Sequence, residues 1–380
     1  MPPKKSRIWA TIQVAAFGLA AIAAHAASAA APVAGPTGGA DRGGVSVVSR
    51  PPLRTVPTYN IAAGLEGEVF PAFANYASLQ RAEDRRWGTI AVTINNSTDQ
   101  PLRNRLTVQI PGWSDVEIQI AEMPAGDQRT YLFAPTFLPR FYQNNEIVAA
   151  TALVTATDMA GHQLFTGTSA VRLRAVGDMY WGTNFRFAPF IASWVTPHDP
   201  YVEQILADAK EYMPGRRLPG YEQHKSVAAQ ERSTWMQAQA IYQALQKSGL
   251  SYVKSSITFG GNEGWSERVR TPRESLRQRS ANCIDAAVMY ASLFENLDME
   301  PVVVIVPGHA YVGVRTAPHS TRYLYIEAAM TGRIPFPAAI ASAERGLSHY
   351  PLAEVHLIRI HDAREAGIYP LPLPPAAALK

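Results

Sequence analysis

The stretch ANCIDAAVMYASLFENLDMEPVVVIVPGHAYVGV (281–314) decides the fold class of the second half of this 380-residue chain. Its first half carries apolar side chains at helical spacing, which predicts a helix that begins at Cys283. Residues 301–306 form an uninterrupted apolar run, which is typical of a buried strand. A Pro-Gly turn then leads into predicted strands at 309–314 and 323–328. A long helix followed by neighbouring strands indicates an α+β domain.

The segments around this stretch contain further helices. Apolar spacing and end signals predict helices at 201–213, 226–247, 271–276 and 336–345, and a strand at 354–360. Residues 257–270 contain three glycines and predict a loop. They do not follow a strand-to-helix pattern, so they are not a phosphate-binding loop.

The first half of the chain has the pattern of an all-β domain over residues 58–178. Short alternating segments separated by Gly, Pro and Asn are typical of an antiparallel β-sandwich of immunoglobulin type. The predicted strands are 89–94, 106–110, 116–120, 147–157, 163–168 and 169–175. Such a domain positions a substrate or binds a partner rather than carrying chemistry.

The domain order follows from these patterns. The predicted α+β domain covers residues 179–370 and is followed by a tail, 371–380. The aromatic segment 176–200 is interpreted as the seam between the two domains or, equally, as local core. Residues 30–57 are rich in Ala, Pro, Gly and Ser without apolar periodicity, which predicts a flexible linker.

Residues 1–29 have the layout of a secretory signal peptide. A cationic start precedes an apolar run from Ile8 to about Ala24, and small residues then offer cleavage near Ala26 or Ala29. Polar residues interrupt the apolar run, which argues against a membrane span, and we expect no span in the mature chain. The protein is therefore expected to be exported, either periplasmic or secreted.

The charge of the chain argues against nucleic acid as a partner. The formal net charge of +4 includes Lys4, Lys5 and Arg7 of the predicted leader, which contains no acidic residue, so the remainder carries +1. A nearly neutral chain without a basic stripe lacks the electrostatic footprint of a nucleic-acid-binding protein. An apolar content of 47% and a charged content of 17% exclude disorder for most of the chain.

Cys283 is the only cysteine, so it has no partner for an internal disulfide. On cysteine count alone, the favoured interpretation is a buried small hydrophobe. The position of Cys283 at a helix start favours reactivity instead, because unpaired N–H groups and the helix dipole stabilise a thiolate there. In an exported protein a single thiol also suggests a reactive role.

His309 and Glu327 are the candidate partners of this cysteine. Strand alternation places His309 on one face with Tyr311 and Gly313, while the opposite face is apolar. A lone histidine is more often structural, but a cysteine at a helix start favours a functional role. If the next strand pairs antiparallel, the Glu327 carboxylate reaches the imidazole and holds the ring. The alternative for Glu327 is a solvated carboxylate on a sheet face.

The order of cysteine on a helix, then histidine and an acid on successive strands, resembles the core of the transglutaminase-like superfamily, which is related to papain-type cysteine peptidases. The matching segments lie within roughly residues 230–330: Ala281-Asn282-Cys283-Ile284-Asp285, Gly308-His309-Ala310-Tyr311-Val312 and Ile326-Glu327. The family usually has Asp followed by Pro-Thr at the third segment, whereas this chain has Glu327 followed by Ala328-Ala329. The resemblance is to exported bacterial members in which this core follows a β-domain.

The resemblance implies thiol acyl-transfer chemistry on a peptide or protein amide. Cys283 would attack the carbonyl, His309 would move the proton and Glu327 would orient the imidazole. The oxyanion would be held by the Cys283 backbone N–H and by a second donor, for which Asn282 and Trp265 are the candidates.

Other polar residues are expected to be structural. Asp285 lies in the first turn of the helix, where its negative charge would interact favourably with the helix dipole. It would also pair with an arginine from 270–279. His356 and His361 face opposite ways on a strand-like segment, which makes them a poor metal pair. We expect no metal and no cofactor.

Two functions stay open from the sequence. The first is an exported cysteine-dependent acyl-transfer enzyme, either a peptidase or amide hydrolase or a transglutaminase-like cross-linker, acting through a thioacyl intermediate. The second is a catalytically inactive transglutaminase-like module that binds or assembles in the cell envelope, where the β-domain would dock to a protein partner. Hydrolysis and cross-linking share the thioacyl step, so the sequence does not separate them.

Overall fold

The structure is a computed structural model that describes residues 56–81, 87–222, 226–254, 258–261 and 264–375, without the side chains of 258–261, 264 and 265. All of the described residues belong to one compact unit. The fold class is α+β, as the sequence predicts. The predicted signal peptide, nearly all of the predicted linker and the last five residues of the predicted tail lie outside the described residues.

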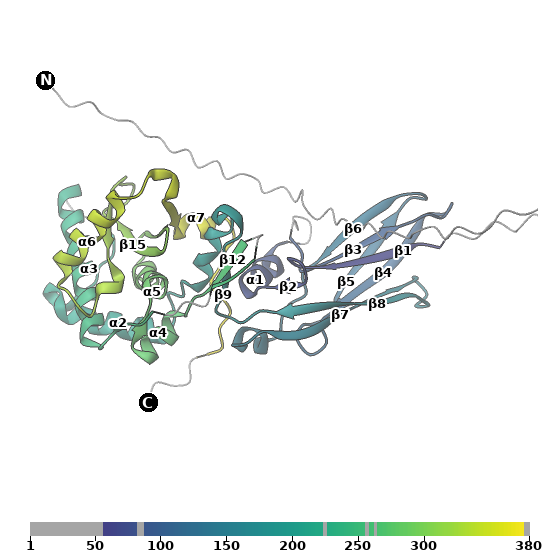
Figure 1. Ribbon diagram of the computed structural model, residues 1–380, viewed down its shortest axis with the longest axis horizontal. Coiled ribbons are helices and arrows are strands. Elements are labelled where there is room, and N and C mark those ends of the chain that lie inside the picture. The colour runs from purple at the N-terminus through teal and green to yellow at the C-terminus, as the bar shows by residue number, and fades with distance from the viewer. Residues whose placement is uncertain (1–55, 82–86, 223–225, 255–257, 262–263, 376–380) are drawn as a thin grey trace, which may run out of the picture. The chain divides into compact units, whose positions relative to one another are not determined.

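The α-helices and many of the strands are labelled in Figure 1. The strands are β1 (Thr58–Ala63), β2 (Glu68–Val69), β3 (Ile90–Asn95), β4 (Leu102–Gln109), β5 (Glu117–Met123), β6 (Gln128–Phe133), β7 (Val148–Thr157), β8 (Gln163–Leu173), β9 (Asp178–Tyr180), β10 (Ser251–Tyr252), β11 (Thr258–Gly261), β12 (Gly264–Arg268), β13 (Ser280–Ala281), β14 (Pro301–Val306), β15 (His309–Arg315), β16 (Tyr323–Ile326) and β17 (His356–Arg359). The α-helices are α1 (Pro71–Leu79), α2 (Pro200–Ala209), α3 (Val227–Lys247), α4 (Pro272–Gln278), α5 (Cys283–Asn296), α6 (Phe336–Ser348) and α7 (Ile360–Glu365). The 3₁₀ helices are η2 (Pro139–Gln143), η3 (Thr183–Phe185), η4 (Ala188–Trp194), η5 (Lys210–Tyr212), η6 (Pro214–Arg216), η7 (Ala328–Met330) and η8 (Leu352–Glu354).

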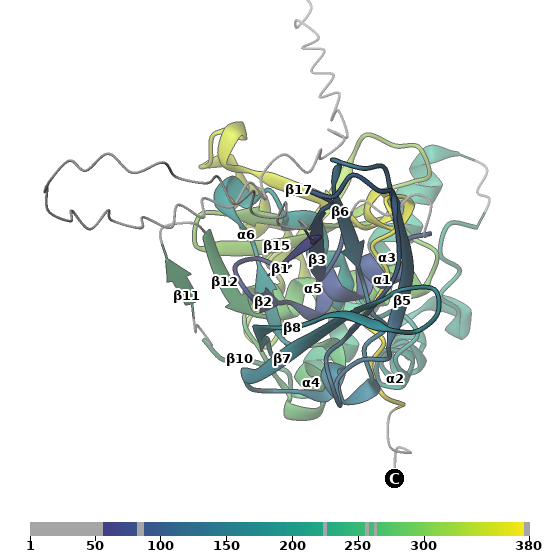
Figure 2. The same cartoon turned by 90° about the vertical axis from the view of Figure 1, so that its right-hand side faces the viewer.

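The first strands form two sheets, one in the order β1-β3-β6 and one in the order β2-β8-β7-β4-β5. Their pairings are antiparallel except for β2 with β8, and β7 and β8 run side by side in Figure 2. Alternate residues of β3 and β4, such as Val92 and Val108, are fully buried in one hydrophobic core. This period of two is the pattern that predicts strands here.

The sheet β16-β15-β14-β17 carries the residues of the decisive stretch, and its pairings are antiparallel. Side chains on one face, including Val303 and Val312, join the main core together with α5. Side chains on the other face, including Val304 and Tyr311, form a second cluster with Ala343 of α6. The predicted division of β15 into two faces is therefore confirmed.

The prediction of a loop at 257–270 is wrong. β11 and β12 pair as an antiparallel hairpin, and β12 also pairs with β9, where Glu267 lies opposite Met179. The glycines of this segment have low strand propensity, but pairing with a strand more than eighty residues earlier overrides that local preference.

Most residues of the aromatic segment 176–200 are buried. Phe187 and Phe190 lie with ring centroids 4.9 and 4.4 Å from that of Phe73 on α1. Trp181 and Trp194 are almost completely buried. These rings are hydrophobic core shared by α1 and the η3–η4 region. The domain boundary near residue 178 stays a prediction.

One largely buried arginine, Arg364, links α7 to the core. The guanidinium of Arg364 donates to Glu295 at 2.9 and 3.0 Å and to the carbonyl oxygens of Ala192, Val195 and Ile368. Only 16% of the Arg364 side chain is exposed, so these bonds form largely away from water. Arg364 thereby links α7, η4 and the last turn of α5.

We predict that Arg364→Ala lowers the free energy of unfolding by about 3 kcal/mol, because Glu295 and three carbonyl groups lose a partly buried partner. The matched control is Arg345→Ala on α6, which is exposed and should change the free energy by less than about 0.5 kcal/mol. Urea unfolding followed by tryptophan fluorescence measures both. Equal effects of the two substitutions would contradict the anchoring role.

Candidate active site

Cys283 is the first residue of α5, as predicted. The helix begins there because Asn282 and Asp285 form a capping box. The Asn282 side-chain oxygen accepts from the Asp285 backbone N–H at 2.8 Å, and the Asp285 carboxylate accepts from the Asn282 backbone N–H at 3.1 Å. Cys283 is half-buried, so its sulfur combines partial desolvation with the positive end of the helix dipole.

Asp285 is fully buried and links the start of α5 to the segment between β12 and α4. Its carboxylate accepts from the Arg270 backbone N–H at 2.8 Å and lies 3.4 Å from the Arg270 guanidinium. Burial raises the pKa of Asp285, and the hydrogen bonds and charge of Arg270 oppose that effect. The predicted pairing of Asp285 with an arginine from 270–279 is confirmed, and its structural role stays a prediction.

His309 and Glu327 meet because β15 and β16 pair antiparallel, with Val312 opposite Ile326. The Nε2 atom of His309 lies 2.9 and 3.1 Å from the two carboxylate oxygens of Glu327. The predicted contact is thus confirmed, although β16 ends at Ile326 and Glu327 lies just beyond it, before η7. Glu327 is only 7% exposed, which strengthens its interaction with the imidazole.

The same imidazole also makes a side-chain hydrogen bond with Cys283. Burial lowers the pKa of His309, but the hydrogen bonds and charges of Cys283 and Glu327 outweigh burial and raise the pKa to about 10. The structure therefore brings together all three predicted residues from α5, β15 and the end of β16.

The ring of Tyr311 packs against the imidazole of His309. Its ring meets that of His309 edge to face, with centroids 4.6 Å apart at 90°. Tyr311 is buried, and its hydroxyl fills the space that a side chain at Gly346 of α6 would need. This packing restricts rotation of the His309 ring away from its partners.

The two candidate oxyanion donors stay predictions. The side-chain oxygen of Asn282 is used as the helix cap and the residue is 3% exposed. Trp265 lies on β12 opposite Gly260, and its side chain lies outside the described part of the chain.

Two residues near the site have no signal in the sequence. Tyr252 of β10 lies opposite Ala281 of β13, two residues before Cys283, through a parallel pairing. Burial raises the pKa of Tyr252, with smaller contributions from the charges of Cys283 and Glu327. Burial and the charge of Asp285 raise the pKa of Glu267 to about 7, whereas a hydrogen bond with Trp181 acts to lower this pKa. Both residues come from short strands whose position depends on pairing with distant parts of the chain.

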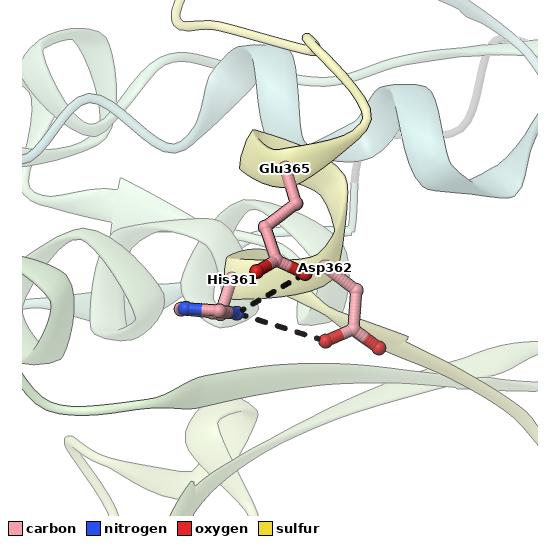
Figure 3. A group of neighbouring side chains, drawn as sticks. All are labelled: His361, Asp362 and Glu365. Carbon is pink, nitrogen blue, oxygen red and sulfur yellow. Dashed lines mark ion pairs between the residues drawn. The ribbon is translucent and has the colours of Figure 1, made fainter.

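Figure 3 shows a second group of polar side chains, His361, Asp362 and Glu365 on α7. Nδ1 of His361 lies 3.9 Å from Asp362 and 3.8 Å from Glu365, and their candidate ligand atoms lie within 4.8 Å of one another. All three side chains are more than half exposed, which is typical of a solvated cluster of ion pairs. His356 lies elsewhere, with its ring centroid 4.6 Å from that of Phe185.

Comparison with protein-family models and with curated proteins finds no match. In the part of the chain that the structure describes, none of the helices combines the length and the apolar content needed to cross a membrane. The inferences below therefore depend on the geometry of this chain.

We predict that Glu327→Gln lowers the pKa of His309 from about 10 toward the ordinary value of 6.5, because a neutral amide stabilises the imidazolium less than a carboxylate does. NMR titration of the His309 ring protons measures this pKa. The matched control is Glu365→Gln, which removes the exposed acid beside His361 and should leave His309 unchanged. An unaltered His309 titration in Glu327→Gln would contradict the contact.

We also predict that Asp285→Asn lowers the free energy of unfolding by about 2 kcal/mol. The reason is that an amide can accept only some of the hydrogen bonds that the buried carboxylate accepts. Asp362→Asn, at an exposed aspartate, serves as the control and should change the free energy by less than about 0.5 kcal/mol. Thermal unfolding by calorimetry gives both values, and a neutral Asp285→Asn would refute the anchoring role.

Proposed function

We propose that this protein is a cysteine-dependent acyl-transfer enzyme that acts on peptide or protein amides through a thioacyl intermediate. The observation that carries the proposal is the His309 imidazole, which is hydrogen-bonded to Cys283 and, through Nε2, to the buried carboxylate of Glu327. A nucleophile, a base and a group that orients the base are the parts that covalent catalysis of acyl transfer requires.

The resemblance to the transglutaminase-like superfamily supports the same function. That family has cysteine at a helix start and histidine and an acid on successive strands, and here the three residues lie at α5, β15 and the end of β16. The usual Asp is Glu327 in this chain, yet its carboxylate reaches the imidazole. A papain-like core after an immunoglobulin-type β-domain is part of this proposal.

The protonation of the site supports a thiolate nucleophile. With its pKa raised to about 10, His309 holds a proton at neutral pH. In the proposed reaction Cys283 gives its proton to His309, which forms a thiolate and an imidazolium. Glu327 stabilises the imidazolium and fixes its orientation.

In the proposed reaction, the Cys283 sulfur forms a bond to the amide carbonyl carbon, and the π electrons move onto the carbonyl oxygen. In this proposal the Cys283 backbone N–H, at the helix start, stabilises that oxyanion. The C–N bond then breaks, and His309 donates its proton to the leaving amine. Water or a second amine attacks the thioester and gives a proton to His309 as the C–S bond breaks.

We also propose that the enzyme works outside the cytoplasm. The support is the signal-peptide layout of residues 1–29 and a single cysteine without a disulfide partner. In that setting the β-rich part of the chain would position a substrate or bind an envelope protein.

The proposal predicts that iodoacetamide alkylates Cys283 at pH 6 at least tenfold faster in the native protein than in the urea-unfolded chain, because the imidazolium of His309 stabilises the thiolate. Intact mass at timed quenches gives the rates. His309→Gln should remove the acceleration, and the exposed-site control His361→Gln should retain it. Cys283→Ala should show no labelling.

Equal or slower labelling of the native protein would reject the enzyme and favour the alternative, an inactive module that binds or assembles in the cell envelope. A direct test of the intermediate uses aryl esters of N-acetyl amino acids. A mass increase equal to the acyl group, absent in Cys283→Ala, would show the thioacyl enzyme.

A further inference from the structure

Helix α6 carries a glycine, Gly346, in its last turn. Glycine weakens a helix relative to alanine, because it loses more conformational freedom on folding. The backbone at Gly346 does not require glycine, since its φ is not positive. A Cβ atom at this position would instead collide with the hydroxyl of Tyr311 and lie 3.0 Å from the Cζ atom of the same ring. The absence of a side chain at residue 346 is therefore explained by the tyrosine that lies against it.

Tyr311 connects Gly346 to the imidazole of His309. The two rings lie on one face of β15, with centroids 4.6 Å apart and planes at 90°. Tyr311 is 4% exposed and packs in one cluster with Val304 of β14 and Ala343 of α6. The phenol is thus enclosed between helix and imidazole. In a close-packed interior it can move only if one of these neighbours moves.

The same helix also contacts Glu327, the partner of His309. The backbone N–H of Glu327 donates to the carbonyl oxygen of Ala339 at 3.2 Å. Glu327 lies just beyond β16, so this bond supports the chain where the strand has ended. Ala339, Ala343 and Gly346 recur at helical spacing and form one face of α6. Their small size allows the helix to approach both residues closely.

Tyr311 acts on His309 through its shape rather than through charge. Burial, with smaller contributions that include the charges of Glu327 and Cys283, raises the pKa of Tyr311 to about 12. The phenol is therefore neutral at neutral pH. Its effect on the imidazole comes from the space that its ring occupies.

The imidazole tolerates little displacement by such a neighbour. Its Nε2 atom lies 2.9 and 3.1 Å from the two carboxylate oxygens of Glu327, and the ring is also hydrogen-bonded to Cys283. A side chain that serves two partners must be held within about 0.5 Å of its productive place. A Tyr311 ring pushed toward His309 would turn the imidazole away from one of them.

We propose that α6 is the positioning element of the candidate site, and that Gly346 is a positioning residue that sets the place of Tyr311 and, through it, the orientation of the His309 imidazole. The inference rests on the proposed function and assigns to it residues that do not touch the substrate. It predicts that one methyl group added to α6 misplaces the imidazole while the fold persists.

The test is Gly346→Ala in the full chain. Iodoacetamide should alkylate Cys283 at pH 6 at least tenfold more slowly than in the unsubstituted protein, because the turned imidazole no longer stabilises the thiolate. NMR titration should show the pKa of His309 falling from about 10 toward 6.5. A merely structural role of Gly346 would move neither value in the folded protein. Glu344→Ala, at an exposed residue of the same helix, is the matched control and should change neither value.

A second substitution tests whether the effect passes through Tyr311. Tyr311→Phe keeps the ring and removes the hydroxyl, which is the atom nearest to the added methyl group. The remaining Cζ atom needs a shift of only a few tenths of an ångström to make ordinary contact. Gly346→Ala combined with Tyr311→Phe should therefore react with iodoacetamide at least fivefold faster than Gly346→Ala alone. A double variant as slow as Gly346→Ala would contradict the route through Tyr311.

Failure of the positioning role and failure of the proposed function give different results. Accelerated labelling of the unsubstituted protein, with an equal rate and an equal His309 pKa in Gly346→Ala, would overturn the positioning role alone. Unaccelerated labelling of the unsubstituted protein would overturn the proposed function. If Gly346→Ala does not fold, Tyr311→Leu decides by the same two measurements, because it removes the ring beside His309 and leaves α6 unchanged.

Discussion

One buried carboxylate fixes the geometry of the candidate site. Asp285 accepts hydrogen bonds from the backbone N–H groups of Asn282 and Arg270, and it forms an ion pair with the Arg270 guanidinium. These contacts decide where α5 begins, and they therefore decide that Cys283 is its first residue. Desolvating a carboxylate is costly, and the cost is offset only because charged and backbone donors surround it. A shift of the helix start by one residue would turn the sulfur by about 100° around the helix axis.

The antiparallel sheet then brings the other two residues to the sulfur. β15 begins at His309, β16 ends one residue before Glu327, and the pairing between them sets the distance between the two side chains. Glutamate is one methylene longer than the aspartate usual in the resembling family. Here Glu327 lies just beyond the end of its strand, and its two carboxylate oxygens lie 2.9 and 3.1 Å from Nε2.

The sequence predicts this region well because its signals are local. Apolar spacing after Cys283, the continuous run at 301–306 and alternation at 309–314 each identify an element without reference to the rest of the chain. The β11–β12 hairpin could not be predicted in this way, because it depends on pairing with β9. The same holds for Tyr252, whose neighbour Ala281 is known only from a two-residue parallel pairing.

The charges around the sulfur follow from this packing. Asp285 and Glu327 are both buried, and the charge of Asp285 also acts on a third carboxyl, Glu267. Three ionised carboxylates would oppose a negative sulfur. The charge of Arg270 compensates that of Asp285, and the imidazolium of His309 compensates Glu327. Burial and the charge of Asp285 raise the pKa of Glu267 to about 7, so this carboxyl is partly neutral near pH 7. Since Coulomb interactions are only weakly screened in a half-buried site, this compensation lowers the cost of keeping several charged groups close to His309.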